Sequence, residues 1–377
     1  MPEPVASGPA APEPASSEPA SPEPRVSEPA APGSVLAADR AGAPPSPSGG
    51  RAPRLLGGRI PMARLREFAL VPAIVAVAIA GWIVDPVFVQ RQNLINILQT
   101  MSEIALLVLA QALVLIVRKM DLSLESTMGL APGVAAWLTV SEAGQGLDLL
   151  PGALAVPVTL AVGVAIGLVN ALLIVRFGLS GFIVTLGMLI MLRGTLTGIS
   201  GGQTFFQLPR SMSYLGTTQW LGLPVSVWLC LTLFAIGIAV LGYTSFGRSL
   251  YAIGGNEDAA RAAGIRTHRT VAVVLVVAGL LAALGGLLLS GRLGSVAAAQ
   301  GDGAIFTVFA AAVIGGVSLS GGRGSLFGAF TGILLLFMIQ NVLTLGGVPA
   351  EWIDALNGSI ILLALVMSRI TTGKAQD

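Results

Sequence analysis

The sequence predicts an all-α, polytopic membrane protein of about ten transmembrane helices that follow a disordered N-terminal tail rich in proline, alanine and glutamate. Three observations predict this class. First, 54% of the 377 residues are hydrophobic and only 11% are charged, whereas soluble domains carry about 25% charged residues. Second, the apolar residues gather in runs of about 20, the length that crosses about 30 Å of hydrocarbon. Third, the basic residues favour one predicted side of the membrane.

The N-terminal part of the chain differs in composition from the rest. Residues 1–50 repeat Pro, Ala, Ser and Glu, as in APEPASSEP, with almost no large apolar residue. Such a segment buries too little surface to offset its ordering entropy, so we expect a disordered cytoplasmic tail. We then expect a basic juxtamembrane segment at 51–67, a transmembrane domain at 68–370 and a C-terminal tail at 371–377. The basic segment contains Arg51, Arg54, Arg59, Arg64 and Arg66.

Ten apolar runs fill the transmembrane domain. Arg118, Lys119 and Asp121 separate the second run from the third, and only a glycine-rich turn separates the eighth from the ninth. Each run is near the length of a membrane-spanning helix. The predicted spans are 68–84, 94–117, 122–140, 151–175, 181–200, 223–243, 270–290, 303–320, 324–345 and 352–369.

Positively charged residues test this topology. If the N-terminus lies in the cytoplasm, the outer connections contain only Arg91, Arg210 and Arg292 as basic residues. This is the positive-inside asymmetry, and it places both termini in the cytoplasm. Besides the five arginines of 51–66, the cytoplasmic basic residues are Arg118, Lys119, Arg176, Arg248, Arg261, Arg266, Arg269, Arg323, Arg369 and Lys374.

Glycines spaced four residues apart share one helix face and let two backbones approach closely. We therefore expect helix packing at the glycines that follow this spacing, with helix breaks that line a path as the alternative. They are Gly163 with Gly167, Gly194 with Gly198, and the series Gly324, Gly328 and Gly332.

The chain offers few groups for catalysis. Its single cysteine, Cys230, and single histidine, His268, allow neither an internal disulfide nor a His/Cys metal cluster. The nucleotide-binding pattern G-x-x-x-x-G-K-[ST] does not occur. We therefore expect no catalytic residue, no metal and no cofactor in this chain, and no nucleic-acid partner.

The most informative segment is the predicted cytoplasmic loop at 244–269, TSFGRSLYAIGGNEDAARAAGIRTHR. Asn256 suits a helix N-cap, Glu257 and Asp258 suit the first turn, and Gly264 suits the C-terminal stop. This pattern predicts a short helix at 257–263. Because two helical turns are not stable alone in water, the helix requires a surface to dock on. A passive connector lying on the membrane is the alternative interpretation.

Three blocks resemble one protein family. The run GRSLYAIGGNEDAARAAGI resembles the cytoplasmic loop of the ribose/xylose-type permeases of bacterial ABC importers, with Gly247 and Arg248 followed by the block from Tyr251 to Asn256. VIGGVSLSGGRGSLFGA at 313–329 and GFIVTLGMLIMLRGTLTGISGGQ at 181–203 match further blocks of that family. The resemblance covers about 68–370, and the three blocks occur in the family's order.

The resemblance implies a function and a set of partners. The chain would be the permease subunit of an ATP-driven importer in the bacterial inner membrane, forming the path for a monosaccharide delivered by a periplasmic binding protein. A second permease chain, identical or a close paralogue, would complete the path within membrane lipid. A tandem-cassette ATPase would bind ATP and Mg and receive the 257–263 helix. The implied coupling residues are Gly254, Gly255, Asn256, Glu257, Ala259, Ala260, Arg261 and Gly264.

Polar residues within apolar runs are candidates for the substrate path. An uncharged sugar needs hydrogen-bonding side chains and benefits from an aromatic plane. For each amide, a hydrogen bond between helices is the alternative. The candidates are Gln111, Asn170, Phe182, Thr185, Gln340 and Asn341, together with Gln99.

Four further polar residues lie in or beside the spans. We expect Arg193 to pair or snorkel near the outer end of its span, with a gating role as the alternative. Asp121 and Ser123 are expected to cap the third span, with a structural or gating role as the alternative. Glu103 is a functional candidate if it lies inside the second span.

Two other classes of function compete with the permease. An ion-coupled secondary transporter needs ion-binding groups near the midplane, and we expect few acidic residues there. An intramembrane enzyme needs a nucleophile and a base, which Cys230 and His268 do not supply together. Within the ABC class, a sugar alcohol, a furanone signal or a branched-chain amino acid is the alternative cargo, and the Tyr-Ala-Ile-Gly-Gly-Asn block favours the sugar branch.

Overall fold

The computed structural model describes residues 70–349 together with 352, 355, 358 and 359. These residues belong to one compact unit, Gly58–Asp377. The predicted tail at 1–50, the basic segment at 51–67, most of the tenth span and the C-terminal tail at 371–377 lie outside the described residues.

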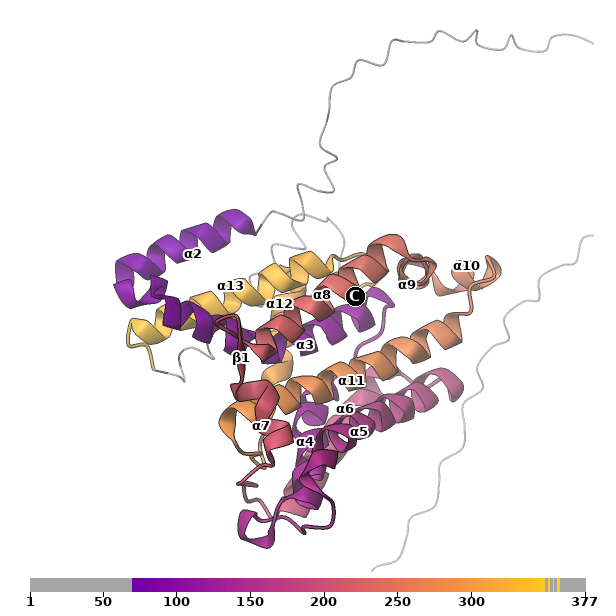
Figure 1. Ribbon diagram of the computed structural model, residues 1–377. Coiled ribbons are helices and arrows are strands. Elements are labelled where there is room, and N and C mark those ends of the chain that lie inside the picture. Colours follow the sequence, from indigo (N-terminus) through magenta and orange to yellow (C-terminus); the bar gives the residue numbers. More distant parts are fainter. Residues whose placement is uncertain (1–69, 350–351, 353–354, 356–357, 360–377) are drawn as a thin grey trace, which may run out of the picture. The chain divides into compact units, whose positions relative to one another are not determined.

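Helices dominate the described part of the chain (Figure 1). They are α2 (Val71–Val84), α3 (Arg91–Ile116), α4 (Leu124–Thr139), α5 (Ala155–Ala171), α6 (Gly181–Ser200), α7 (Arg210–Thr217), α8 (Val225–Tyr243), α9 (Ser245–Gly255), α10 (Glu257–Ala262), α11 (Thr267–Leu293), α12 (Ala304–Ile314) and α13 (Leu326–Leu345). The shorter elements are the helical turns η1 (Pro86–Val89), η2 (Glu142–Gly144), η3 (Gly152–Leu154) and η4 (Leu172–Arg176), and the paired strands β1 (Gln219–Trp220) and β2 (Leu223–Pro224).

A helix occupies each of the first nine predicted spans. Six segments are long and apolar enough to cross a membrane, namely Arg91–Ile116, Gly152–Arg176, Gly181–Ser200, Val225–Tyr243, Thr267–Leu293 and Leu326–Leu345. These confirm an all-α, multi-pass membrane protein. In the described residues α2, α4 and α12 are shorter than the predicted spans at those places, so the count of ten stays a prediction.

The eighth predicted span, 303–320, is wrong in its extent. α12 ends at Ile314, and the chain then enters a glycine-rich turn. Gly316 and Gly321 have φ values of +82° and +78°, which L-residues with a side chain rarely adopt. The turn ends at Ser325, whose hydroxyl accepts a hydrogen bond from the Gly328 N–H and so begins α13. The glycines stop α12 at about half the length of a membrane span.

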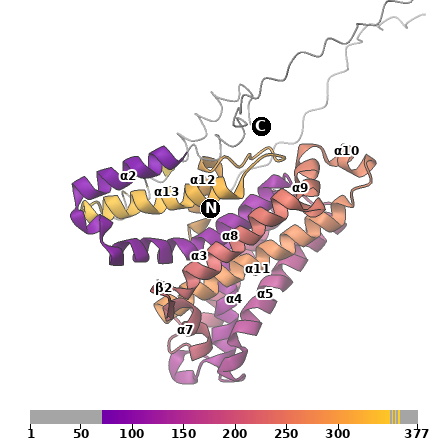
Figure 2. The same cartoon turned by 45° about the horizontal axis from the view of Figure 1, so that its top comes forward.

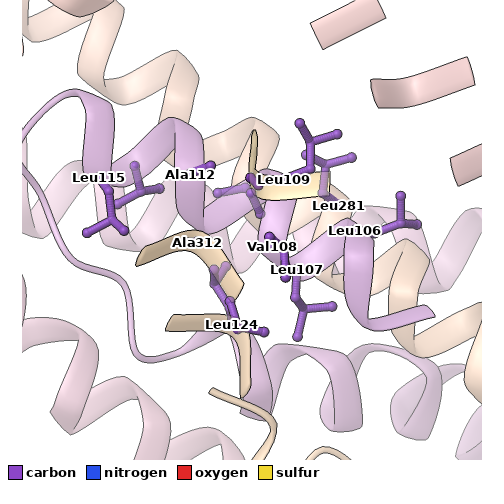
Figure 3. Close-up of a cluster of buried hydrophobic side chains, with 14 of the residues drawn as sticks. Leu106, Leu107, Val108, Leu109, Ala112, Leu115, Leu124, Leu281 and Ala312 are labelled. Atoms are coloured by element: carbon purple, nitrogen blue, oxygen red, sulfur yellow. The ribbon is translucent and has the colours of Figure 1, made fainter. Parts of the chain in front are cut away.

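Helix α3 forms the centre of the packed core (Figure 3). Most of its apolar side chains are buried on every face, which is typical of a helix surrounded by other helices. In the close-up, side chains of α3 such as Leu106 and Val108 lie among Leu124 of α4, Leu281 of α11 and Ala312 of α12. By contrast, α6 exposes large apolar side chains such as Ile183 and Ile190, as expected for a helix facing lipid.

Small residues bring two helix pairs into close contact. A Cβ atom added to Gly163 of α5 would lie 2.6 Å from the carbonyl oxygen of Gly279 in α11, and one added to Gly328 of α13 would lie 2.1 Å from that of Gly315 beside α12. These contacts confirm packing roles at two of the predicted glycine sets. Gly194 and Gly198 of α6 face open space within the described structure.

Connections that the charge pattern assigns to one side of the membrane meet each other in space. Among the predicted outer connections, Phe205 pairs with Val296, and the Phe206 N–H donates to the Gly144 carbonyl at 3.1 Å. Among the predicted cytoplasmic connections, the Gly322 N–H donates to the Ile116 carbonyl at 2.9 Å. Two views agree that α7 and α10 lie at opposite ends of the long helices (Figure 1, Figure 2). This arrangement supports the alternating order of the spans.

Candidate functional site

The predicted short helix is present as α10, Glu257–Ala262. The side-chain oxygen of Asn256 accepts a hydrogen bond from the Ala259 N–H at 2.9 Å, which caps the N-terminus as predicted. Gly264 has a φ of +84° just beyond the helix, as expected of a C-terminal stop. The local chemistry of this loop therefore confirms the N-cap and the stop that the sequence indicates.

α10 exposes nearly all of its surface. Ala260 is 5% exposed and packs on the core, whereas Asp258, Ala259, Arg261 and Ala262 are exposed. Of the other predicted coupling residues, Gly255, Asn256 and Gly264 are exposed, Glu257 is half-buried and Gly254 is buried. A two-turn helix that buries one side chain gains little stability from packing on the rest of the chain. Its outward surface consists largely of small residues.

The Glu257 carboxylate ties α10 to the end of α3. It lies 3.4 Å from the Lys119 ammonium and 3.2 Å from the Arg261 guanidinium one turn later. Both pairs are partly exposed, so each contributes little to stability. Only the Lys119 pair joins the first turn of α10 to the connection between α3 and α4, because the Arg261 pair lies within α10.

An unpredicted helix, α9, joins α10 to the membrane domain. Gly254 of α9 lies so close to α3 that an added Cβ would be 1.8 Å from the Ile116 carbonyl oxygen. The Tyr251 hydroxyl donates to the Gly324 carbonyl at 2.9 Å. The signal for α9 was present, because the Thr244 side chain caps the helix by accepting from the Gly247 N–H. α9 therefore connects α10 to α3 and to the glycine-rich turn after α12.

One predicted path residue, Asn170, lies in a polar cluster at the predicted cytoplasmic end of the helices. The Asn170 amide donates to Ser123 Oγ at 2.8 Å and to the Asp121 carboxylate at 3.3 Å. Ser123 occupies the N-cap position of α4 as predicted, but its side chain makes no capping hydrogen bond. Its N–H and hydroxyl instead donate to the Asp121 carboxylate, so the pair forms a local turn. Burial raises the pKa of Asp121, opposed by hydrogen bonds from Ser123 and Asn170. The Thr185 hydroxyl donates within its own helix, to the Gly181 carbonyl.

The other predicted path residues do not converge with these. Asn341 of α13 exchanges amide hydrogen bonds with Asn93 at the opposite end of the helices. Phe182 is 51% exposed on α6, and Gln340 is half-buried. Gln111 is fully buried in α3, and its amide has no hydrogen-bond partner within the described part of the chain. The earlier candidate Gln99 donates to the Gly216 carbonyl at 2.8 Å.

Glu103, the acidic candidate in the second predicted span, lies inside the helical core. Glu103 of α3 is 1% exposed and is held by the Arg292 guanidinium of α11 through two contacts of 2.5 and 2.9 Å. This bidentate geometry is the strongest form of such a pair. The pair joins α3 to α11.

A second ion cluster, which the sequence did not reveal, joins α4, α6 and α12. Arg193 pairs with Glu125 at 2.6 Å and with Asp302 at 2.8 Å. The other Glu125 oxygen accepts from the Ile305 N–H at 3.0 Å, in the first turn of α12. Arg193 therefore pairs as predicted, with residues from two distant segments, but it lies closer to the middle of α6 than to the predicted outer end of the helix. No signal local to Glu125 or Asp302 identifies them as partners.

Among the described residues, no group of three or more His, Cys, Asp or Glu side chains could hold a metal ion. Cys230 is buried in α8, and His268 lies at the start of α11, so the two are separate.

Comparisons with known proteins agree with this geometry. Residues 93–365 match the family described as branched-chain amino acid transport system / permease component. The autoinducer 2 import system permease protein of Klebsiella pneumoniae is 36% identical, over 80% of this chain and 86% of its own length. The ribose import permease protein of Escherichia coli is 33% identical, over 80% and 93%. The E. coli xylose transport system permease protein is 30% identical, over 81% and 92%. No solved structure matches the chain.

Proposed function

Because the chain belongs to the branched-chain amino acid transport system / permease component family, we propose that it is the permease subunit of an ATP-driven importer for a monosaccharide. Two of the relatives are named for ribose and xylose and one for autoinducer 2. These names support a small polyhydroxylated cargo over an amino acid. The three sequence blocks shared with ribose/xylose-type permeases support the same choice.

The observation that carries the proposal is the exposed helix α10. It projects alanine side chains and leaves only Ala260 buried. We propose that it docks into a groove on a partner ATPase, which binds ATP and Mg. Movement of α10 would reach the membrane helices through α9, because Gly254 contacts α3 and Tyr251 contacts the turn after α12.

The remaining partners follow from this assignment. A periplasmic binding protein would deliver the solute to the outer connections, and a second permease chain would complete the path in the bacterial inner membrane. We propose ten spans with both termini in the cytoplasm, which the meeting of same-side connections supports. Of the six path candidates, Gln111 remains the most informative, because its buried amide is unpartnered within the described residues.

Substitution of Ala259 tests the docking. Ala259 is exposed on α10, so Ala259→Trp leaves the membrane domain intact while it blocks a close protein contact. We expect ATP-coupled uptake by the reconstituted importer to fall on the order of tenfold or more, equivalent to about 1.4 kcal/mol of lost docking. Ala259→Ser is the matched control and retains uptake. Equal uptake by the Trp and Ser variants would contradict the docking.

An ion-coupled secondary transporter is the second candidate, and the buried Glu103 and Glu125 are the observations that favour it. Both carboxylates are engaged by arginine in the structure, which leaves neither free to exchange ions. Purified permease alone in liposomes, given a proton or sodium gradient, separates the two mechanisms. We expect no uptake without the ATPase, and gradient-driven uptake would establish the secondary transporter.

A further inference from the structure

A cavity opens where α12 begins. Its volume is about 660 Å³, within the range of about 300–1,000 Å³ that is usual for small-molecule sites. Ile104 of α3, Met128 of α4 and Leu289 of α11 form apolar walls, and segment 299–307 together with Gly358 supplies the rest of the described lining. The six predicted path residues are absent from its described lining, so this cavity is a separate candidate.

Helix lengths place the cavity near the middle of the predicted hydrocarbon layer. α12 has 11 residues, which span about 16 Å, and its C-terminal end meets the predicted cytoplasmic turn. Arg193 lies about 18 Å along α6 from Gly181, by the same rise per residue. Both estimates place the start of α12 about halfway through a hydrocarbon layer of about 30 Å.

The segment before α12 is fixed in this deep position by the side chain of Gln300. Its amide donates to the Met128 carbonyl and to Ser290 Oγ, both at 3.0 Å. Gly301 allows close approach to α4, because an added Cβ would lie 2.3 Å from the Glu125 carbonyl oxygen. The backbone beside the cavity is therefore held by hydrogen bonds to α4 and α11.

Three side chains give the cavity its chemical character. The Asp302 side chain is 45% exposed although it pairs with Arg193. Arg193 Nε is 2.8 Å away but points poorly for a hydrogen bond, so the Asp302 carboxylate retains acceptor capacity. Thr307 adds a hydroxyl, and Phe306 is 67% exposed beside it.

The charges favour a neutral ligand. Glu125 already occupies the N-terminus of α12 through the Ile305 N–H, so an anion finds no free helix end there. A cation such as Ca²⁺ needs six or more oxygen ligands, whereas Asp302 is the one carboxylate in the described lining and already pairs with Arg193. A hydroxyl group can donate to this carboxylate in a short, charge-assisted hydrogen bond.

We propose that this cavity is a transient binding site for the transported solute, and that it takes a neutral polyhydroxylated molecule. Asp302 accepts hydrogen bonds from solute hydroxyls, Thr307 donates or accepts one, and Phe306 offers an aromatic face. Arg193 and Glu125 are positioning residues that hold Asp302 and α12. The inference rests on the proposed importer function and adds the location and chemistry of one contact site on the path.

Uptake by the complete importer gives the first test. Permease, ATPase and binding protein are reconstituted together, and a panel of radiolabelled pentoses and hexoses that includes D-ribose and D-xylose is measured. For any sugar that the wild type imports, Asp302→Asn and Thr307→Val should lower uptake on the order of tenfold, as expected for one lost hydrogen bond to a charged or well-placed group. The matched controls Asp148→Asn and Thr344→Val, at exposed positions elsewhere, should import normally.

Cysteine labelling gives a second test that does not depend on transport. In a Cys230→Ala background, Thr307→Cys should react with a maleimide in the reconstituted complex. The imported sugar, at a concentration about ten times its Kd for the cavity, should slow this labelling about tenfold. L-leucine at the same concentration should not slow it. This variant keeps Arg193, Glu125 and Asp302 unchanged, so misfolding of the ion cluster is not at issue.

The outcomes separate the two proposals. Normal uptake by Asp302→Asn and Thr307→Val, or labelling of Thr307→Cys that sugar does not slow, would overturn the binding site while the importer stands. Protection by L-leucine would overturn the polyhydroxylated ligand. If the wild-type complex imports no sugar of the panel with ATP, the proposed importer function itself fails.

Discussion

Two ion clusters lie inside the apolar helices, and their surroundings differ. Glu103 and Arg292 form a closed, bidentate pair between α3 and α11, with the Glu103 side chain only 2% exposed. In the second cluster, Arg193 divides its contacts between Glu125 and Asp302, and the Asp302 side chain is 45% exposed to a cavity. The first pair satisfies both partners, whereas the second leaves a carboxylate available to a ligand.

This difference teaches how similar residues serve different tasks in lipid. Charged groups inside a membrane are costly, so they persist where they pair or where they bind something. The Glu103–Arg292 pair fixes two helices that are both central to the core. The Glu125–Arg193–Asp302 cluster fixes the start of a short helix at the edge of a cavity. Substitutions that separate stability from transport distinguish the two.

The largest loss of stability is expected from Arg292→Met. It leaves the buried Glu103 carboxylate without its partner, and loss of one member of a buried pair costs about 3 kcal/mol or more. Thermal unfolding of the purified protein in detergent measures the change. Arg210→Met is the control, because Arg210 is exposed and has no ion pair within the described residues.

A double variant tests whether the buried charge is the cause. Glu103→Met together with Arg292→Met removes both charges, and it should recover most of the stability that Arg292→Met loses. An Arg292→Met protein as stable as Arg210→Met would show that this pair does not hold α3 to α11.

An intermediate effect is expected from Glu125→Gln. The amide keeps the size of the side chain but loses the charge that faces Arg193 and the first turn of α12. Both Glu125 oxygens accept hydrogen bonds, whereas the amide keeps one acceptor oxygen, so one of the two bonds is lost. Hydrogen bonds to charged groups contribute about 1.5–3 kcal/mol, and the one retained neutral bond limits the loss to about 1–2 kcal/mol. Thermal unfolding and sugar uptake are both measured, with the exposed Glu142→Gln as control. Uptake at the level of Glu142→Gln would mean that the second cluster, like the first, serves structure alone.

The sequence predicted what local patterns determine. Hydropathy located the six long apolar segments, and the Asn256 cap and Gly264 stop located α10, because capping depends on residues within one turn. The extent of α12 was wrong, since an apolar run through Gly315 and Gly316 gives no direct sign that the backbone turns there.

The ion clusters could not be predicted, because their partners are brought together by tertiary packing. Arg292 and Asp302 read as parts of outer connections, yet the first reaches Glu103 in α3 and the second reaches Arg193 deep in α6. The depth of segment 299–303 depends on Gln300 binding to α4 and α11. The candidate path residues were polar positions within the predicted apolar runs. Asp302 was missed because it lies outside those runs.

The smallest change in stability is expected from Asp302→Asn, although its effect on uptake is large. The Asp302 side chain is 45% exposed and that of Arg193 is 38% exposed, and pairs of this kind contribute less than about 1 kcal/mol. Glu125 remains to neutralise Arg193, so no buried charge is left alone. Thermal unfolding should match that of Asp148→Asn within about 1 kcal/mol. Destabilisation as large as that of Arg292→Met would instead place Asp302 among the groups that hold the helices together, and its loss of uptake would then report folding and not solute binding.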